Sequence, residues 1–250
     1  MHHLSLTDVK AVADFLWRVR RGTTLSGFVA MVLQDLKALI PCDIVSYNEF
    51  HAAPPMINTT ALPVSVLPPE STAAVTRHYR DHPLLLHQLR TGDGSPRRIT
   101  DMTSMRMFRK TALWTELYRP LRFRSEIALA LPAPAGAARC VALDRDGRDF
   151  GERDLKLLRL VQPYLAEMQR ELDAAGRVQL LSQREREAVG LVADGKTNAE
   201  VAAVLGISPR TVQKHMQHVY DKLGVRRRAG AAVLSRLFQR SGQGDDGETG

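Results

Sequence analysis

A dense series of helix start and stop signals near the C-terminus constrains this chain most. Ser182-Gln183-Arg184-Glu185 and Thr197-Asn198-Ala199-Glu200 have the spacing of capping boxes, in which a hydroxyl and a carboxylate satisfy free amides at a helix start. Ser208-Pro209 is a third start, because proline is harmless at the first helical position. The expected helices end at glycines, which favour helix termini: Gly195, Gly206 and Gly224. The pattern predicts four helices, over about residues 182–194, 197–205, 208–223 and 226–238.

The second and third of these helices are separated only by Gly206, Ile207 and the cap residue. So short a connection is typical of a helix-turn-helix, whose second helix enters the major groove of DNA. One side of the third helix is apolar and is expected to face the core: Val212, Met216, Val219 and Leu223. The opposite side carries Arg210, Lys214, Gln217 and Asp221, flanked by Thr211, Gln213 and His218. Arginine and lysine suit phosphates or guanine edges, and glutamine suits adenine.

The positive charge of the chain is concentrated in this segment. Residues 177–240 hold 12 basic and 5 acidic residues, a balance of +7, within a net charge of +8 for the whole chain. Such a basic segment indicates a polyanionic partner. The last ten residues are glycine-rich and acidic, and we expect residues 239–250 to be a disordered tail.

Residues 179–238 resemble, without a gap, the LuxR/GerE-type DNA-binding domain of bacterial transcription factors. The resemblance is carried by residues 181–187, 195–202, 207–215 and 222–225. It implies that base edges are read by Gln213, Lys214 and Gln217. It implies phosphate contact or bracing of the helix by Lys196, Thr197, Asn198, Arg210, Thr211 and His215. It also implies dimerisation through the fourth helix, where Arg226-Arg227-Arg228 is more basic than is usual for the family.

Two other functions compete for this region. Residues 190–197 match the phosphate-binding P-loop pattern, with Lys196 as its lysine, and would make the chain a nucleotide-binding enzyme. That loop needs a buried strand before its first glycine, whereas a helical pattern precedes Gly190. Sigma factors carry a similar helix-turn-helix, but they would need aromatic, basic melting helices upstream, and residues 1–176 lack them. We therefore expect a protein that is not an enzyme.

The first 172 residues show a mixed helix and strand pattern. Helices are predicted near residues 6–21, 25–40, 70–80, 83–90 and 151–172, and strands near 44–50, 126–131 and 139–143. This order indicates an α/β sensor domain of the GAF or PAS type. It also resembles the sensor halves found with LuxR-type domains, through residues 79–84 and 142–150. A phosphoreceiver domain would begin with a strand that ends in paired acids, and this chain begins with two helices.

Four aromatic residues fall close together in this half: Phe108, Trp114, Tyr118 and Phe123. They line either the core or a small-molecule pocket, for which they are our candidates. An acyl-homoserine-lactone receptor is an alternative, since Asp81 and Pro83 resemble the acidic stretch of that family. However, the Trp-x-x-x-Tyr pattern expected just before that stretch is missing, and Trp114…Tyr118 comes after it instead.

Metal and cysteine chemistry have weak support in the same half. His78, His82 and His87 could form a metal face, but Pro83 would disturb such a helix, and we expect no metal and no cofactor. The chain has two cysteines, Cys42 and Cys140, which are too few for a disulfide framework. We expect both to be buried structural thiols.

The sequence thus predicts two domains: an N-terminal α/β GAF/PAS-like sensor over residues 1–172 and a C-terminal all-α four-helix helix-turn-helix over 179–238, joined by a linker at 173–178. No signal peptide or membrane span is evident, so the protein should be soluble and cytoplasmic. The expected partners are double-stranded DNA, a second copy of the chain, an unknown small-molecule effector and RNA polymerase.

Overall fold

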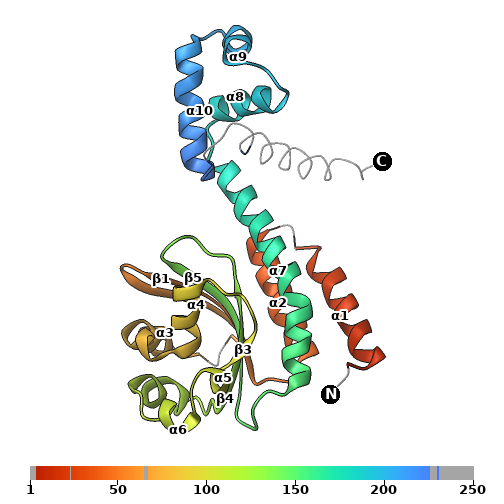
Figure 1. The fold of residues 1–250 in the computed structure, drawn as a ribbon, viewed down its shortest axis with the longest axis vertical. Helices are drawn as coiled ribbons and strands as arrows, with labels where there is room; N and C mark the ends of the chain where they lie inside the picture. Colours follow the sequence, from red (N-terminus) through yellow and green to blue (C-terminus); the bar gives the residue numbers. More distant parts are fainter. Residues whose placement is uncertain (1–3, 23, 65–66, 226–229, 231–250) are drawn as a thin grey trace. The chain divides into compact units, whose positions relative to one another are not determined.

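The computed structural model describes residues 4–22, 24–64, 67–225 and 230. The chain divides into two compact units, residues 1–169 and residues 170–250. The first unit combines a sheet with helices, and the described part of the second is helical (Figure 1). The prediction of an N-terminal α/β domain and a C-terminal helical domain is confirmed. Among the described residues, no helix has the length and apolarity that a bilayer crossing requires.

A five-stranded antiparallel sheet forms the middle of the first unit. Its order is β2-β1-β5-β4-β3, with β1 Ile44–Ala52, β2 Pro55–Leu62, β3 Arg97–Arg98, β4 Ser125–Leu131 and β5 Ala137–Arg145. The sequence predicted β1, β4 and β5 but not the two edge strands. Proline-rich flanks obscured β2, whose edge position tolerates Pro55 at its first residue.

The two faces of the sheet differ in chemistry. On β1, β4 and β5, the odd-numbered face is mostly apolar and buried: Val45, Tyr47, Ile127, Leu129, Leu131, Val141 and Leu143. The even-numbered face of these strands carries Ile44 and Phe50 and otherwise small or polar side chains: Ser46, Asn48, Glu126, Ala128, Ala130, Ala138, Cys140, Ala142 and Asp144. Because successive side chains of a strand point to opposite sides, this alternation gives the sheet one tightly packed face and one with room beside it.

Helices cover both faces, as Figure 1 shows. On the odd-numbered face lie α1 Leu6–Val19, α2 Leu25–Leu39 and the start of α7 Glu152–Gln179. Near the even-numbered face lie α3 Pro69–His78, η1 Tyr79–Asp81, α4 Pro83–Thr91, α5 Ile99–Met102, α6 Met105–Phe108 and η2 Trp114–Tyr118.

The long helix α7 is fixed to the sheet by polar as well as apolar contacts. The Tyr47 hydroxyl donates to Oε1 of Gln169 at 3.0 Å, and the Gln162 amide donates to the Ala130 carbonyl at 3.2 Å. Residues 173–178, where we expected a linker, are helical and continue α7 without a break. The boundary between the two units therefore falls inside a helix.

The second unit packs three helices, α8 Gln183–Ala193, α9 Asn198–Leu205 and α10 Pro209–Leu223, around one apolar core. The predicted core residues of α10 are all buried: Val212, Met216, Val219 and Leu223. Both predicted capping boxes are present. The expected helix at 226–238 and the expected disordered tail at 239–250 lie outside the described residues, apart from Gly230, which is helical.

Candidate nucleic-acid interface and ligand cavity

The turn between α9 and α10 has the geometry that its sequence predicts. Gly206 adopts φ 65° and ψ 35°, a left-handed conformation that glycine enters without steric cost. The Ile207 amide donates to the Ala202 carbonyl at 3.1 Å, and the Ser208 hydroxyl accepts the Thr211 amide at 3.1 Å. These bonds hold α9 and α10 as a helix-turn-helix.

The side of α10 opposite its buried residues is open to solvent. Gln213, Lys214 and Gln217, the predicted base readers, are all exposed. The Gln217 amide donates to Oδ1 of Asp221 at 3.1 Å, a contact that a nucleic acid could replace. Within the described part of the chain, neither Lys214 nor the exposed Arg210 has a carboxylate partner. Their charges are therefore available to a polyanion.

The residues predicted to contact phosphate lie at the start of α9 and along α10. Arg210 and Thr197 are exposed, whereas Lys196, Asn198, Thr211 and His215 are half-buried. Two of them also act within the domain. The Thr197 hydroxyl donates to Glu200 at 2.8 Å and caps α9, and the Thr211 amide completes the cap of α10. Phosphate contact by these six side chains stays a prediction.

The P-loop alternative does not fit the structure. Gly190 to Ala193 belong to α8, and the Asp194 amide donates to the Gly190 carbonyl at 3.0 Å. The amide of Lys196 likewise donates to the Leu191 carbonyl at 3.1 Å. These backbone groups close a helix end and leave no ring of free amides for a phosphate.

Glu185 is the buried charge that joins the helices of this unit. It is only 4% exposed, it accepts the Ser182 amide at 2.7 Å, and Lys222 of α10 donates to it at 2.6 Å. Burial acts to raise the pKa of Glu185, but the hydrogen bonds from Lys222 and Ser182 outweigh it and hold the pKa below its ordinary value. The carboxylate thus stays ionised and fixes the start of α8 to the end of α10.

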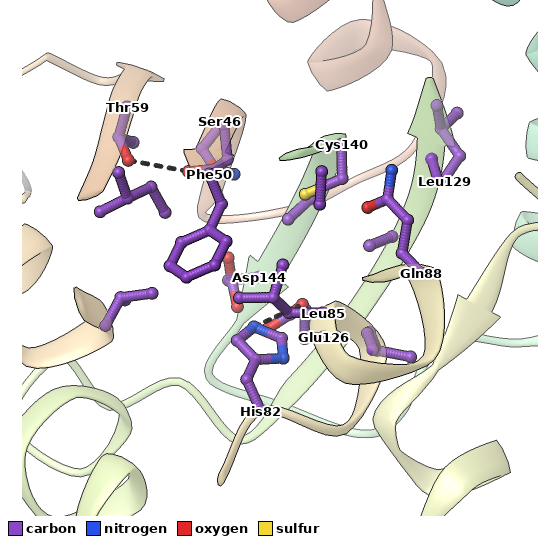
Figure 2. A pocket seen from close by; sticks show the side chains of 18 of the residues that line it. Ser46, Phe50, Thr59, His82, Leu85, Gln88, Glu126, Leu129, Cys140 and Asp144 are labelled. Carbon is purple, nitrogen blue, oxygen red and sulfur yellow. Dashed lines mark hydrogen bonds and ion pairs between the residues drawn. The ribbon is translucent and has the colours of Figure 1, made fainter. Parts of the chain in front are cut away.

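The first unit contains a cavity of about 100 Å³ between the even-numbered face of the sheet and α3 and α4 (Figure 2). Small side chains of β4 and β5 create the space: Ala128, Ala130, Ala138 and Ala142. Apolar residues form much of the remaining wall: Ile44, Phe50, Ile57, Leu67, Val75, Leu84, Leu85, Leu117 and Phe123. A mostly apolar hollow with a few convergent polar groups is typical of a small-molecule site.

The four aromatic candidates for this pocket do lie together. Rings of Phe108, Trp114 and Phe123 surround Tyr118, at centroid distances of 4.8, 6.0 and 6.3 Å. Tyr118 and Phe123 line the cavity, whereas Phe108 and Trp114 pack in the core beside it. The cluster therefore serves mainly as core and contributes two side chains to the cavity wall.

One end of the cavity is polar, and its residues are the ones that sequence reasoning missed. Figure 2 shows His82, Glu126 and Asp144 gathered there. The Tyr118 hydroxyl donates to Glu126 and lies 3.2 Å from Nε2 of His82. Burial, and then the charges of Glu126 and Asp144, raise the pKa of Tyr118 well above its ordinary value, so it remains a donor. Neither acid has a local sequence signature, because only the pairing of β4 with β5 brings them together.

The histidines and cysteines do not form the reactive groups that were considered. His78 contacts Glu116, and His87 lies 3.5 Å from Asp93, so the three histidines face different partners. No cluster of three or more metal-ligating side chains occurs among the described residues. Burial raises the pKa of Cys42 to about 11, and burial followed by the charge of Glu126 raises that of Cys140 to about 12. Both thiols therefore stay protonated and inert near neutral pH.

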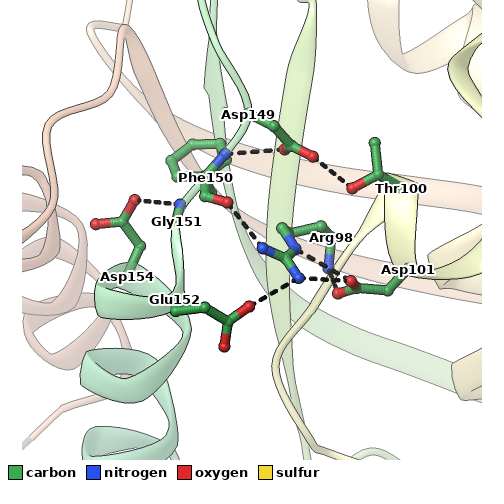
Figure 3. Close-up of polar contacts among 8 residues, drawn as sticks. All are labelled: Arg98, Thr100, Asp101, Asp149, Phe150, Gly151, Glu152 and Asp154. Carbon is green, nitrogen blue, oxygen red and sulfur yellow. Dashed lines mark hydrogen bonds and ion pairs between the residues drawn. The ribbon is translucent and has the colours of Figure 1, made fainter. Parts of the chain in front are cut away.

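A second polar cluster fixes the start of α7 (Figure 3). Arg98 donates to Asp101 at 2.8 Å, to Glu152 at 3.1 Å and to the Phe150 carbonyl at 3.0 Å. The neighbouring residue Arg97 lines the cavity. The short strand β3 therefore has one arginine at the cavity and one at the helix that leads toward the second unit.

Comparison with known proteins identifies one segment of the chain. Residues 179–235 match the family described as "Bacterial regulatory proteins, luxR family". The "Probable transcriptional regulatory protein SgaR" of Hyphomicrobium methylovorum is 47% identical over 61 residues, which are 24% of this chain and 29% of that protein. The "Putative HTH-type transcriptional regulator y4qH" of Sinorhizobium fredii is 30% identical over 162 residues, 60% of this chain and 47% of that protein. The chain thus spans less than half the length of these curated relatives.

The fold of the first unit also has a counterpart. The LBD domain of VqsR from Pseudomonas aeruginosa matches 67% of this chain and 99% of its own, with a TM-score of 0.50 and 17% identity. At that identity the likeness concerns the fold alone. It agrees with an α/β domain that precedes the matched C-terminal segment.

Proposed function

We propose that this chain, whose residues 179–235 form a DNA-binding domain of the luxR family, is a bacterial transcription regulator that binds duplex DNA sequence-specifically. The observation that carries the proposal is the exposed face of α10, with Gln213, Lys214 and Gln217 on the second helix of a helix-turn-helix. Amide and ammonium groups on such a helix suit the hydrogen-bonding edges of the major groove.

Affinity in this proposal comes from the positive charge around the reading helix. Arg210 and Lys196 flank it, and the local balance of +7 over residues 177–240 attracts the phosphate backbone. Contacts from Thr197, Asn198, Thr211 and His215 would set the register of the domain on the duplex.

The first unit acts in this proposal as a sensor, because its cavity has the mostly apolar lining with a few convergent polar groups of a small-molecule site. Binding there would shift the DNA affinity of the second unit by linkage. Two copies would bind a two-fold symmetric operator, and the regulator would act on RNA polymerase. Because its target is chromosomal DNA, the protein would work in the cytoplasm.

The test uses a duplex selected by the full chain from a random library. Binding is followed by fluorescence anisotropy at several salt concentrations. Lys214→Ala should weaken binding by about 1–3 kcal/mol if it reads a base, and affinity should fall steeply with salt. Lys10→Ala is the matched control, since Lys10 is exposed on α1 and loses the same charge. Equal affinity of Lys214→Ala and Lys10→Ala, or a salt-insensitive complex, would overturn the proposal.

A further inference from the structure

The polar end of the cavity is built on a pair of acids that face each other across two strands. Glu126 of β4 and Asp144 of β5 are register partners in the antiparallel ladder. Directly opposed side chains of this kind have Cβ atoms about 5 Å apart. The two residues are only 4% and 6% exposed, and both line the cavity. Two like charges in that position repel each other unless a cation or a proton lies between them.

Neighbouring groups only partly satisfy this pair. Glu126 accepts from the Tyr118 hydroxyl, and its Oε1 lies 3.6 Å from Nε2 of His82. Oδ1 of Asp144 and Nδ1 of His82 are both buried, and neither atom has a hydrogen-bond partner among the described residues. A buried oxygen without a donor costs free energy, and a ligand that supplies the donor would recover it.

The charged groups around the cavity leave a negative balance at this end. The arginine in the lining, Arg97, lies opposite Ala128 in the ladder, and its guanidinium binds Asp93 at 2.8 Å. His87 also faces Asp93. Cys140, a further ionisable residue that lines the cavity, stays protonated because burial raises its pKa to about 12. No arginine or lysine is therefore paired with Glu126 or Asp144 in the described part of the chain.

The remaining wall would suit an apolar group attached to a cation. Phe123 contributes an aromatic ring beside Tyr118, the partner of Glu126, and aliphatic side chains of α3 and α4 extend the apolar surface. Aromatic faces attract ammonium groups, and the aliphatic wall favours a hydrocarbon chain. A fatty acid would instead place its carboxylate beside two buried carboxyl groups.

We propose that the cavity binds a small amine, whose protonated nitrogen lies between Glu126 and Asp144 and whose apolar chain packs against the helices. This inference names the effector class of the sensor and so rests on the function proposed above. An ammonium group has three donors, which would serve Oδ1 of Asp144, the Glu126 carboxylate and a third acceptor in the polar end of the cavity. The structure thus favours an amine over a neutral amide, an alcohol or an acid.

The proposal carries a proton balance that can be measured. Burial, and then the charge of Glu126, raise the pKa of Asp144 well above its ordinary value, which favours the protonated carboxyl in the empty cavity. An ammonium ion that enters the cavity stabilises the ionised form of Asp144. Its carboxyl proton then passes to solvent, and binding of the cation releases up to about one proton.

The test compares ligands of equal chain length on the full-length protein by isothermal titration calorimetry near neutral pH. Hexylamine should bind at least about tenfold more tightly than hexan-1-ol, hexanoate or N-hexanoyl homoserine lactone. Glu126→Gln and Asp144→Asn should each weaken hexylamine about tenfold and leave hexan-1-ol unchanged. Asp14→Asn is the matched control, because Asp14 is exposed on α1. Titrations in buffers that differ in ionisation enthalpy should show that hexylamine binding releases a proton from the wild type but not from Asp144→Asn.

Equal affinity for hexylamine and hexan-1-ol, preference for the lactone, or no detectable amine binding would each overturn the inference. Thermal denaturation establishes that each variant is folded. If Glu126→Gln does not fold, Asp144→Asn decides the question alone. Duplex binding is measured separately without amine. DNA binding with no amine binding would refute this inference alone, and amine binding with no DNA binding would refute the regulator alone.

Discussion

The carboxylate of Glu185 offers a sharp test of how the second unit is held together. It caps α8 through Ser182 and, at the same time, binds Lys222 at the end of α10. Glu185→Gln preserves the shape of the side chain and removes its charge. The change therefore probes the charge-assisted hydrogen bonds and not the packing.

The expected loss follows from two contacts. A glutamine at this position can still accept the Ser182 amide, so only the charge-assisted part of that hydrogen bond, about 1 kcal/mol, is lost, and the weakened Lys222 contact adds to it. Lys222 is 39% exposed, so solvent screens its charge and the pair contributes well under 1 kcal/mol. Glu185→Gln should thus lower the free energy of unfolding of the second unit by about 1–2 kcal/mol at pH 7. Because the folded-state pKa of Glu185 is lowered, this stabilisation is present above about pH 4.5 and is lost as the pH falls below it.

The distribution of tryptophan makes the assay specific. Both tryptophans of the chain, Trp17 and Trp114, belong to the first unit. Urea unfolding followed by tryptophan fluorescence therefore reports the first unit, whereas far-ultraviolet circular dichroism reports the helices of both. Glu185→Gln should shift the dichroism transition to lower urea without moving the fluorescence transition. Glu200→Gln is the matched control, because Glu200 is exposed and completes the capping box of α9, and it should cause a smaller shift. Equal shifts in the two variants would refute the role assigned to Glu185.

Two further substitutions test other parts of the account. The raised pKa of Asp144 means that the folded protein binds a proton that the unfolded chain releases above about pH 4, so stability falls as the pH rises. Asp144→Asn should remove this dependence, so its gain over the wild type in thermal melts should grow by up to about 1.4 kcal/mol per pH unit between about pH 4 and the raised pKa of Asp144, and a constant gap would contradict it. Gly206→Ala forces a side chain into left-handed backbone and should cost the second unit about 1 kcal/mol. Gly176→Ala, in open space on α7, should instead be neutral or stabilising by dichroism, and equal effects would exclude the strain argument.

The second unit could be read from the sequence because its signals are local. Each capping box, glycine stop and apolar stripe acts within about one helix, and no distant residue is needed to interpret it. Ser182, Thr197 and Ser208 each cap the helix that the pattern assigned to them. Helices α1 and α2 were likewise predicted close to their observed bounds.

The first unit was harder to read because its organisation depends on contacts between distant segments. The edge strand β2 is held by its pairing with β1, and the prolines in and around it gave no indication of a strand. The acids at the cavity come together only because β4 and β5 pair in one register, so Glu126 and Asp144 carry no local signature. The aromatic cluster was visible in the sequence, but which of its rings would reach the cavity depended on packing.

The central claim is that the exposed face of α10 reads base edges, and selection from a random duplex library tests it most directly. The wild type should enrich a defined motif, and Gln213→Ala should enrich the same motif with one position relaxed, since a good bidentate contact discriminates by about 1–3 kcal/mol. An identical motif from both proteins, or no enriched motif from the wild type, would contradict the claim.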